Sequence, residues 1–73
     1  MEENNFLKNT GAAIRKIRLQ KNMSQFELAL LCNFEKASMS RIESGLINTR
    51  ILTLRKISDA LGVHINQLFA PKP

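Results

Sequence analysis

The 73-residue sequence has one cysteine, three glycines and two prolines. The single Cys32 can neither close an internal disulfide nor complete a four-ligand zinc site, so two common supports of a very small domain are missing. So few glycines and prolines also exclude a flexible low-complexity chain. Stability is therefore expected from compact packing, with dimerisation as a further source.

Long apolar runs are absent as well, since none approaches the roughly 18 residues that a membrane helix requires. Met1 is followed by Glu2, Glu3, Asn4 and Asn5 rather than by a basic stretch and an apolar core, which indicates that there is no secretory signal. We expect no membrane partner and a soluble, cytoplasmic protein whose thiol is reduced.

Acidic residues are the scarcer charge, with 6 Asp+Glu against 11 Lys+Arg and a net charge of +5. That balance favours a polyanionic partner, either nucleic acid or an acidic protein surface. The length fits one domain over residues 1–73, because independent domains rarely fall below about 50 residues. We expect flexible ends at 1–5 and 70–73.

Helical periodicity recurs along the chain, and no strand pattern of useful length competes with it. The first predicted helix ends near Gln20. A second begins after Ser24, which forms a capping-box pattern with Glu27, and is interrupted at Asn33. Three more helices are predicted, from Glu35 to Ser44, from Ile51 to Leu61 and, for little more than one turn, from Val63 to Phe69. The fold class is all-α with five helices.

The second and third predicted helices are short and are joined by a tight turn. DNA-binding helix-turn-helix units have this form, in which the second helix of the pair enters the major groove. From Ser24 to Gly45 the chain reads S-Q-F-E-L-A-L-L-C-N-F-E-K-A-S-M-S-R-I-E-S-G. This stretch resembles the XRE (Cro/phage-repressor-type) helix-turn-helix family, and the resemblance covers nearly all of the chain after Gly11. It implies a compact, five-helix, lambda-repressor-like DNA-binding domain that commonly acts as a homodimer on a palindromic site.

The resemblance also implies which residues meet DNA. Base contacts are expected on the third helix, from Lys36, Ala37, Ser38, Ser40 and Arg41. Arg41 is the foremost of these, because a guanidinium can donate two parallel hydrogen bonds to guanine O6 and N7, worth about 1–3 kcal/mol of discrimination. Phosphate contacts are expected from Gln25, Glu35, Asn48 and Arg50, and Lys36 can meet either a base or a phosphate. As alternatives, Arg41 and Arg50 are plain surface charges and Gln25 is a polar first-turn residue.

Three positions depart from the family pattern. Asn33 stands where the turn usually has glycine, which asparagine can replace because it tolerates the left-handed conformation. Glu35 occupies the cap position that is usually Ser or Thr, and its carboxylate would face the DNA. Ala37 is short at a position where relatives carry a long polar side chain that contacts bases. We therefore expect few direct base contacts and a larger part for DNA shape or for cooperative dimer binding.

Arg18 and Glu43 are expected to have a structural role. Arg18 lies four residues after Ile14 and Glu43 four after Met39, so each charge is directed towards the inner face of its helix. Neither charge can be buried alone. The resemblance supplies the partner, since family members pair these two positions in a partly buried ion bridge between the first and third helices.

Several apolar residues are expected at the surface. Phe26 and Leu30, four apart on the second helix, should project from its outer face. They are either covered by Phe6 or Leu7 from the amino-terminal segment or form a surface for a partner protein. The family's usual dimer contacts nominate Leu46, Ile47, Leu52, Ile65 and Gln67.

Catalysis is not indicated, and no cofactor or metal is expected. His64 has no second histidine, paired cysteine or carboxylate pair nearby in the sequence, and Cys32 lies on the inner face of its helix. The preferred function is a sequence-specific regulator of transcription that binds double-stranded DNA, a repressor or autoregulator acting as a homodimer on a palindromic operator. The alternative is an antitoxin-type interaction module that neutralises a partner toxin through Phe26/Leu30 or Leu46/Ile47, with or without DNA binding.

Overall fold

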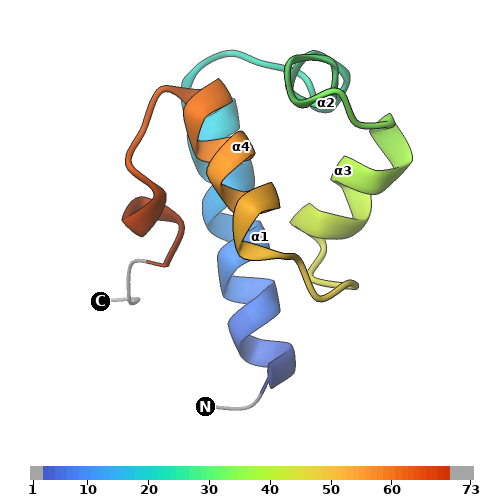
Figure 1. The fold of residues 1–73 in the computed structure, drawn as a ribbon, viewed down its shortest axis with the longest axis vertical. Coiled ribbons are helices and arrows are strands. Elements are labelled where there is room, and N and C mark those ends of the chain that lie inside the picture. Colours follow the sequence, from blue (N-terminus) through green and yellow to red (C-terminus); the bar gives the residue numbers. More distant parts are fainter. Residues whose placement is uncertain (1–2, 70–73) are drawn as a thin grey trace.

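The computed structural model describes residues 3–69, and within that range every regular element is a helix (Figure 1). The elements are α1 (Glu3–Gln20), α2 (Gln25–Cys32), α3 (Lys36–Glu43), α4 (Ile51–Leu61) and the 3-10 helix η1 (Ile65–Phe69). In Figure 1, α2 and α3 lie to one side of α1 and α4, and η1 lies to the other. The predicted all-helical class and the order of the elements are confirmed.

The fifth predicted helix is a 3-10 helix rather than an α-helix. Its hydrogen bonding follows the tighter pattern, with the amide of Gln67 donating to the carbonyl of His64 at 3.0 Å. Short segments commonly take this form, and η1 has only five residues, between the left-handed Gly62 and Pro71. The α1 helix takes in residues 3–5, which the sequence assigned to a flexible end, and residues 70–73 lie outside the described range.

Local signals account for the helix ends on either side of α2. The amide of Glu27 donates to Ser24 Oγ at 3.0 Å and the amide of Ser24 donates to Glu27 Oε1 at 2.8 Å, which completes the predicted capping box. The backbone bond from Ser24 lowers the pKa of the Glu27 carboxyl, and the Ser24 hydroxyl adds to this effect. Asn22 and Asn33 both adopt left-handed backbone, with φ of 59° and 60°. The turns before and after α2 are therefore fixed by residues that tolerate this conformation.

Each of the five elements contributes at least one fully buried apolar side chain to the core. The largest of these are Ile14, Leu28, Met39, Ile57 and Leu68. Burying each of them contributes roughly 1.5–3 kcal/mol relative to exposure. No single pair of helices could bury this set, so the orientation of α2 and α3 depends on the whole domain.

Two glycines allow α1 to approach the end of α3 closely. A Cβ on Gly11 would lie 2.4 Å from the carbonyl oxygen of Glu43 and 2.5 Å from that of Ile42. Gly45 has a φ of +71°, and a Cβ there would lie 2.7 Å from the Cα of Lys8. The backbone of α1 therefore touches the carboxyl end of α3, and this contact sets how α3 is presented.

Candidate nucleic-acid interface

The helix-turn-helix unit consists of α2, the turn at Asn33–Glu35, and α3. The amide of Phe34 donates to the carbonyl of Ala29 at 2.8 Å and so holds the turn against the end of α2. Ala29 is buried, and its small side chain lets α2 and α3 approach each other closely. The turn is therefore short and hydrogen-bonded, and α3 follows α2 in one rigid arrangement.

The expected base-contacting residues share the outer side of α3. Lys36 and Ser40 are four residues apart, as are Ala37 and Arg41, so the two pairs form adjacent rows on the helix surface. Lys36, Ala37 and Arg41 are exposed, whereas Ser38 and Ser40 are half-buried. This side of α3 is polar and basic, while the opposite side supplies Met39 to the core.

The expected phosphate-contacting residues border α3 at both ends. Glu35 is the N-cap residue of α3, is exposed, and makes no capping bond with its side chain. Asn48 and Arg50 are exposed in the segment between α3 and α4, where Arg50 caps α4 through its backbone. All three side chains are thus open to solvent beside the helix that carries Arg41.

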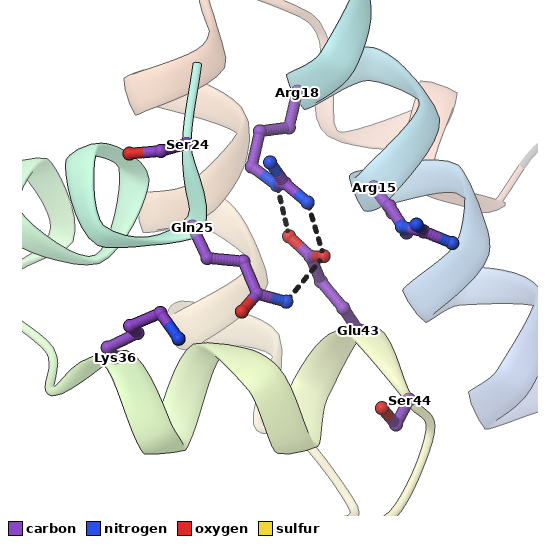
Figure 2. A pocket seen from close by; sticks show the side chains of 7 residues that line it. All are labelled: Arg15, Arg18, Ser24, Gln25, Lys36, Glu43 and Ser44. Carbon is purple, nitrogen blue, oxygen red and sulfur yellow. Dashed lines mark hydrogen bonds and ion pairs between the residues drawn. The ribbon is translucent and has the colours of Figure 1, made fainter.

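Arg18 and Glu43 form a buried, two-point ion pair between α1 and α3 (Figure 2). Arg18 Nε donates to Glu43 Oε2 at 2.7 Å, and Nη2 donates to Oε1 at 3.0 Å. The remaining terminal nitrogen, Nη1, donates to the carbonyl of Met23 at 2.7 Å. The side chains are only 8% and 2% exposed. This arginine therefore ties α3 to α1 and to the turn that precedes α2.

Gln25 belongs to the same network through a hydrogen bond to Glu43. Gln25 is predicted from the sequence to contact a phosphate, but this bond is not predicted. Its Nε2 donates to Glu43 Oε1 at 3.0 Å, so the first residue of α2 is also tied to the carboxyl end of α3. Nε2 carries two hydrogens, and one of them is left for another acceptor. Gln25 is half-buried, and its position is fixed by a buried carboxylate.

An open hollow surrounds this network, here called the α1–α3 hollow (Figure 2). Its lining consists of polar and charged side chains from α1, the start of α2 and both ends of α3. They are Arg15, Arg18, Ser24, Gln25, Lys36, Glu43 and Ser44. Arg15 is the member to which the sequence assigned no role.

The exposed apolar residues on α2 are not covered by the amino-terminal part of α1. Phe26 and Leu30 are 59% and 67% exposed. The prediction that Phe6 or Leu7 covers them is wrong, because the Phe6 ring stacks on Phe69 of η1 instead, with the ring centroids 5.9 Å apart. Figure 1 shows the physical reason, since the first turns of α1 lie at the end of the domain opposite to α2.

The residues nominated for the dimer contact divide into two groups. Leu46, Ile47 and Leu52 are exposed, and Ile51, which was not nominated, lies exposed beside Leu52. Ile65 is half-buried and packs against the core, while Gln67 Oε1 accepts a hydrogen bond from the amide of His64 at 3.2 Å. The loop after α3 and the start of α4 therefore carry four exposed apolar side chains.

Cys32, one of the residues considered for catalysis, is buried in the core. Burial raises the pKa of the Cys32 thiol, with Lys56 acting weakly in the opposite direction, so the nucleophilic thiolate is disfavoured. Among the side chains that the structure describes, those of residues 5–69, no group of three or more His, Cys, Asp and Glu could hold a metal ion. Over residues 3–69 no helix has the length and apolarity needed to cross a membrane.

Comparison with known proteins identifies the family. A sequence profile for the HTH_3 helix-turn-helix family matches residues 14–68, which include the whole helix-turn-helix unit and its ion pair. The chain belongs to the HTH_3 family. The XRE-type resemblance is confirmed, and as an HTH_3 protein the chain is a DNA-binding transcriptional regulator rather than an enzyme.

Several HTH_3 relatives are controller proteins. Control protein C.BamHI of Bacillus amyloliquefaciens is 44% identical over 59 residues, which cover 80% of this chain and 73% of that protein. Control protein C.MunI of Mycoplasma sp is 33% identical over 61 residues and covers 82% of each. The crystal structure of the restriction-modification controller protein C.AhdI from Aeromonas hydrophila matches with a TM-score of 0.84 at 28% identity, covering 86% of this chain and 96% of that one.

Proposed function

We propose that this protein binds a specific palindromic operator as a homodimer and controls transcription of restriction-modification genes, as a repressor or autoregulator. The observation that carries the proposal is the exposed polar side of α3, with Arg41 on it, on a helix held to α1 and α2 by a buried ion-pair network. The controller proteins C.BamHI and C.AhdI support the genetic setting.

In the proposed complex α3 lies in the major groove, which is about 12 Å wide, and α2 crosses the backbone. Arg41 donates two hydrogen bonds to a guanine, and Ala37 contacts a thymine methyl group. Lys36, Ser38 and Ser40 supply further polar contacts. The network around Glu43 keeps α3 fixed, so the contacts form without reorganisation of the protein.

The backbone contacts flank this helix. Gln25 offers its remaining amide hydrogen, and Asn48 and Arg50 meet phosphates at the far end of α3. Glu35, at the start of α3, places its carboxylate near the DNA backbone without a capping bond. Repulsion between this carboxylate and a nearby phosphate lowers the affinity for every DNA sequence alike. The preference for one DNA sequence over another therefore depends on Arg41 and its neighbours on α3, and not on the residues that lie near phosphates.

A charge change at Arg41 tests the readout. Duplexes selected from a random pool supply a cognate site, and Arg41→Ala should lower affinity for it by about 1–3 kcal/mol, with much less change on a scrambled duplex, because only the cognate site offers the matching guanine. The measurement is a titration of both duplexes at several salt concentrations. Arg55→Ala is the control, since Arg55 is an exposed arginine on α4 beside Asp59. A cognate preference that survives Arg41→Ala contradicts the proposed readout.

The homodimer is proposed to form through the apolar surface made by Leu46, Ile47, Ile51 and Leu52. Leu52 is 75% exposed, so Leu52→Lys should leave the protomer folded while placing a charge inside the dimer contact. Losing the linked second half-site should lower operator affinity by about a hundredfold or more. Sedimentation and titration on a full and a half operator measure the two effects.

Leu30→Lys is the matched control, because it introduces the same charge on the other exposed apolar surface, on α2. If Leu30→Lys dissociates the dimer and Leu52→Lys does not, the dimer surface is on α2. None of the three relatives described above is named as an antitoxin. The exposed Phe26 and Leu30 do not by themselves specify a toxin, so the regulator is the better-supported function.

A further inference from the structure

We infer that the segment between α3 and α4 is the place where an endopeptidase first cuts the unpaired protomer, and that dimerisation shields it. This segment, residues 44–50, is here called the α3–α4 loop. The inference rests on the proposed homodimer and deepens it, because it makes the lifetime of the protein depend on its concentration. Whether a loop is cut depends on the burial and hydrogen bonding of its backbone.

The backbone of the α3–α4 loop is weakly held in its second half. The amides of Gly45 and Leu46 still donate to carbonyls of α3, at 3.1 and 3.0 Å. In the part of the chain that the structure describes, the amides of residues 47–50 donate no hydrogen bond to a protein acceptor. The first amides of α4 that follow have no acceptor within their helix either. Opening this stretch therefore breaks few hydrogen bonds.

The other three connections between helices are held more tightly. The amides of residues 21–23 all donate to carbonyls of α1. Those of Asn33 and Phe34 donate to carbonyls of α2, and those of Gly62 and Val63 to carbonyls of α4. The α3–α4 loop is thus the connection with the weakest backbone support between residues 3 and 69.

The side chains of this stretch add little anchoring. Leu46 and Leu52 are 72% and 75% exposed. No residue from 44 to 53 belongs to the hydrophobic core, which the chain enters again at Leu54. A segment with few hydrogen bonds and few buried apolar contacts opens at a lower free energy than the whole domain. The loop can therefore extend into the cleft of an endopeptidase while the core stays folded.

The proposed dimer contact lies on the same part of the chain. Leu46 and Ile47 belong to the loop, and Ile51 and Leu52 follow it on α4. A second copy seated there covers the loop, so pairing and cleavage exclude each other. Cleavage adds water across a peptide bond, which leaves a carboxylate on one fragment and an amine on the other. Unpaired protomers are removed in this way, and dimers persist.

The test is limited digestion of the full chain by thermolysin, which cuts on the amino side of bulky apolar residues. Sedimentation first supplies the Kd of the dimer, and the masses of the earliest fragments locate the first cut. We expect that cut within residues 45–52. At a protein concentration about a hundred times the Kd, cleavage per protomer should be roughly fifteenfold slower than far below the Kd, because only about one protomer in fifteen is unpaired.

Two variants separate shielding from other effects of concentration. Leu52→Lys removes the dimer contact and leaves the cleavable bonds before Leu46 and Ile47 in place, so it should be cut at the fast rate at both concentrations. Leu30→Lys introduces the same charge on the exposed apolar surface of α2. It should keep the concentration dependence of the wild-type protein.

Other outcomes overturn the inference. A first cut outside residues 45–52 would place the weakest segment elsewhere. Cleavage at many bonds that accelerates steeply in dilute denaturant would show that the whole domain must unfold first. Equal rates at both concentrations in a wild-type protein that dimerises overturn the shielding alone. If sedimentation finds no dimer at any concentration, the proposed homodimer fails together with the inference.

Discussion

Replacing Glu43 by alanine is expected to destabilise the fold by about 3–5 kcal/mol, because the substitution leaves the Arg18 guanidinium buried without its partner. Arg18 is bound at two points by Glu43 and keeps only the carbonyl of Met23 when the carboxylate is removed. Gln25 loses its acceptor as well. A domain of this size has a total stability of about 4–11 kcal/mol, so much of it would be lost.

The reciprocal change, Arg18→Met, should also be destabilising, since it leaves a buried carboxylate with Gln25 as its remaining partner. The double variant should cost clearly less than the sum of the two single ones, because it removes both charges together. Denaturant unfolding of the four proteins measures this coupling. Independent, additive effects would show that the pair does not act as a unit.

Gly11→Ala is expected to destabilise the fold by about 1–2 kcal/mol, although alanine is the better helix former. A new Cβ would lie 2.4 Å from the carbonyl oxygen of Glu43, an atom of the α3 backbone that cannot turn aside as a side chain can. Forcing atoms into a packed site costs about 1–3 kcal/mol or more, whereas the gain in helix propensity is about 1 kcal/mol. The clash should therefore outweigh the gain.

Ala12→Gly controls for helix propensity, since Ala12 is exposed on the next position of α1. This change should cost about 1 kcal/mol, as expected for glycine in a helix. Thermal and denaturant unfolding compare the two variants with the wild-type protein. A more stable Gly11→Ala protein would mean that α1 and the end of α3 are not in close contact.

The elements that could be predicted from the sequence depend on residues close together in the chain. The capping box of Ser24 and Glu27 and the left-handed Asn22 and Asn33 are local signals, and they fix the boundaries of α2. The type of the last helix could not be predicted in the same way. A five-residue segment can form either kind of turn, and the surrounding packing decides between them.

The site could be predicted only where a family motif relates distant residues. The pairing of Arg18 with Glu43 came from the resemblance, because spacing alone predicted only that both charges face inwards. The contact of Gly11 with the α3 backbone and the place of Arg15 in the hollow carry no local signal, since each depends on how α1 crosses α3. The same limit explains why Phe6 was expected on α2, although it stacks on Phe69.

Arg41 reading a guanine from the major groove is the central claim, and methylation interference on the bound operator tests it most directly. Methylation of guanine N7 blocks one of the two hydrogen bonds that a guanidinium makes to that base. For the wild-type protein, we expect methylation of at least one guanine in each half-site to prevent binding. In Arg41→Ala that interference should vanish, while interference elsewhere persists. An unchanged pattern in Arg41→Ala would contradict the account.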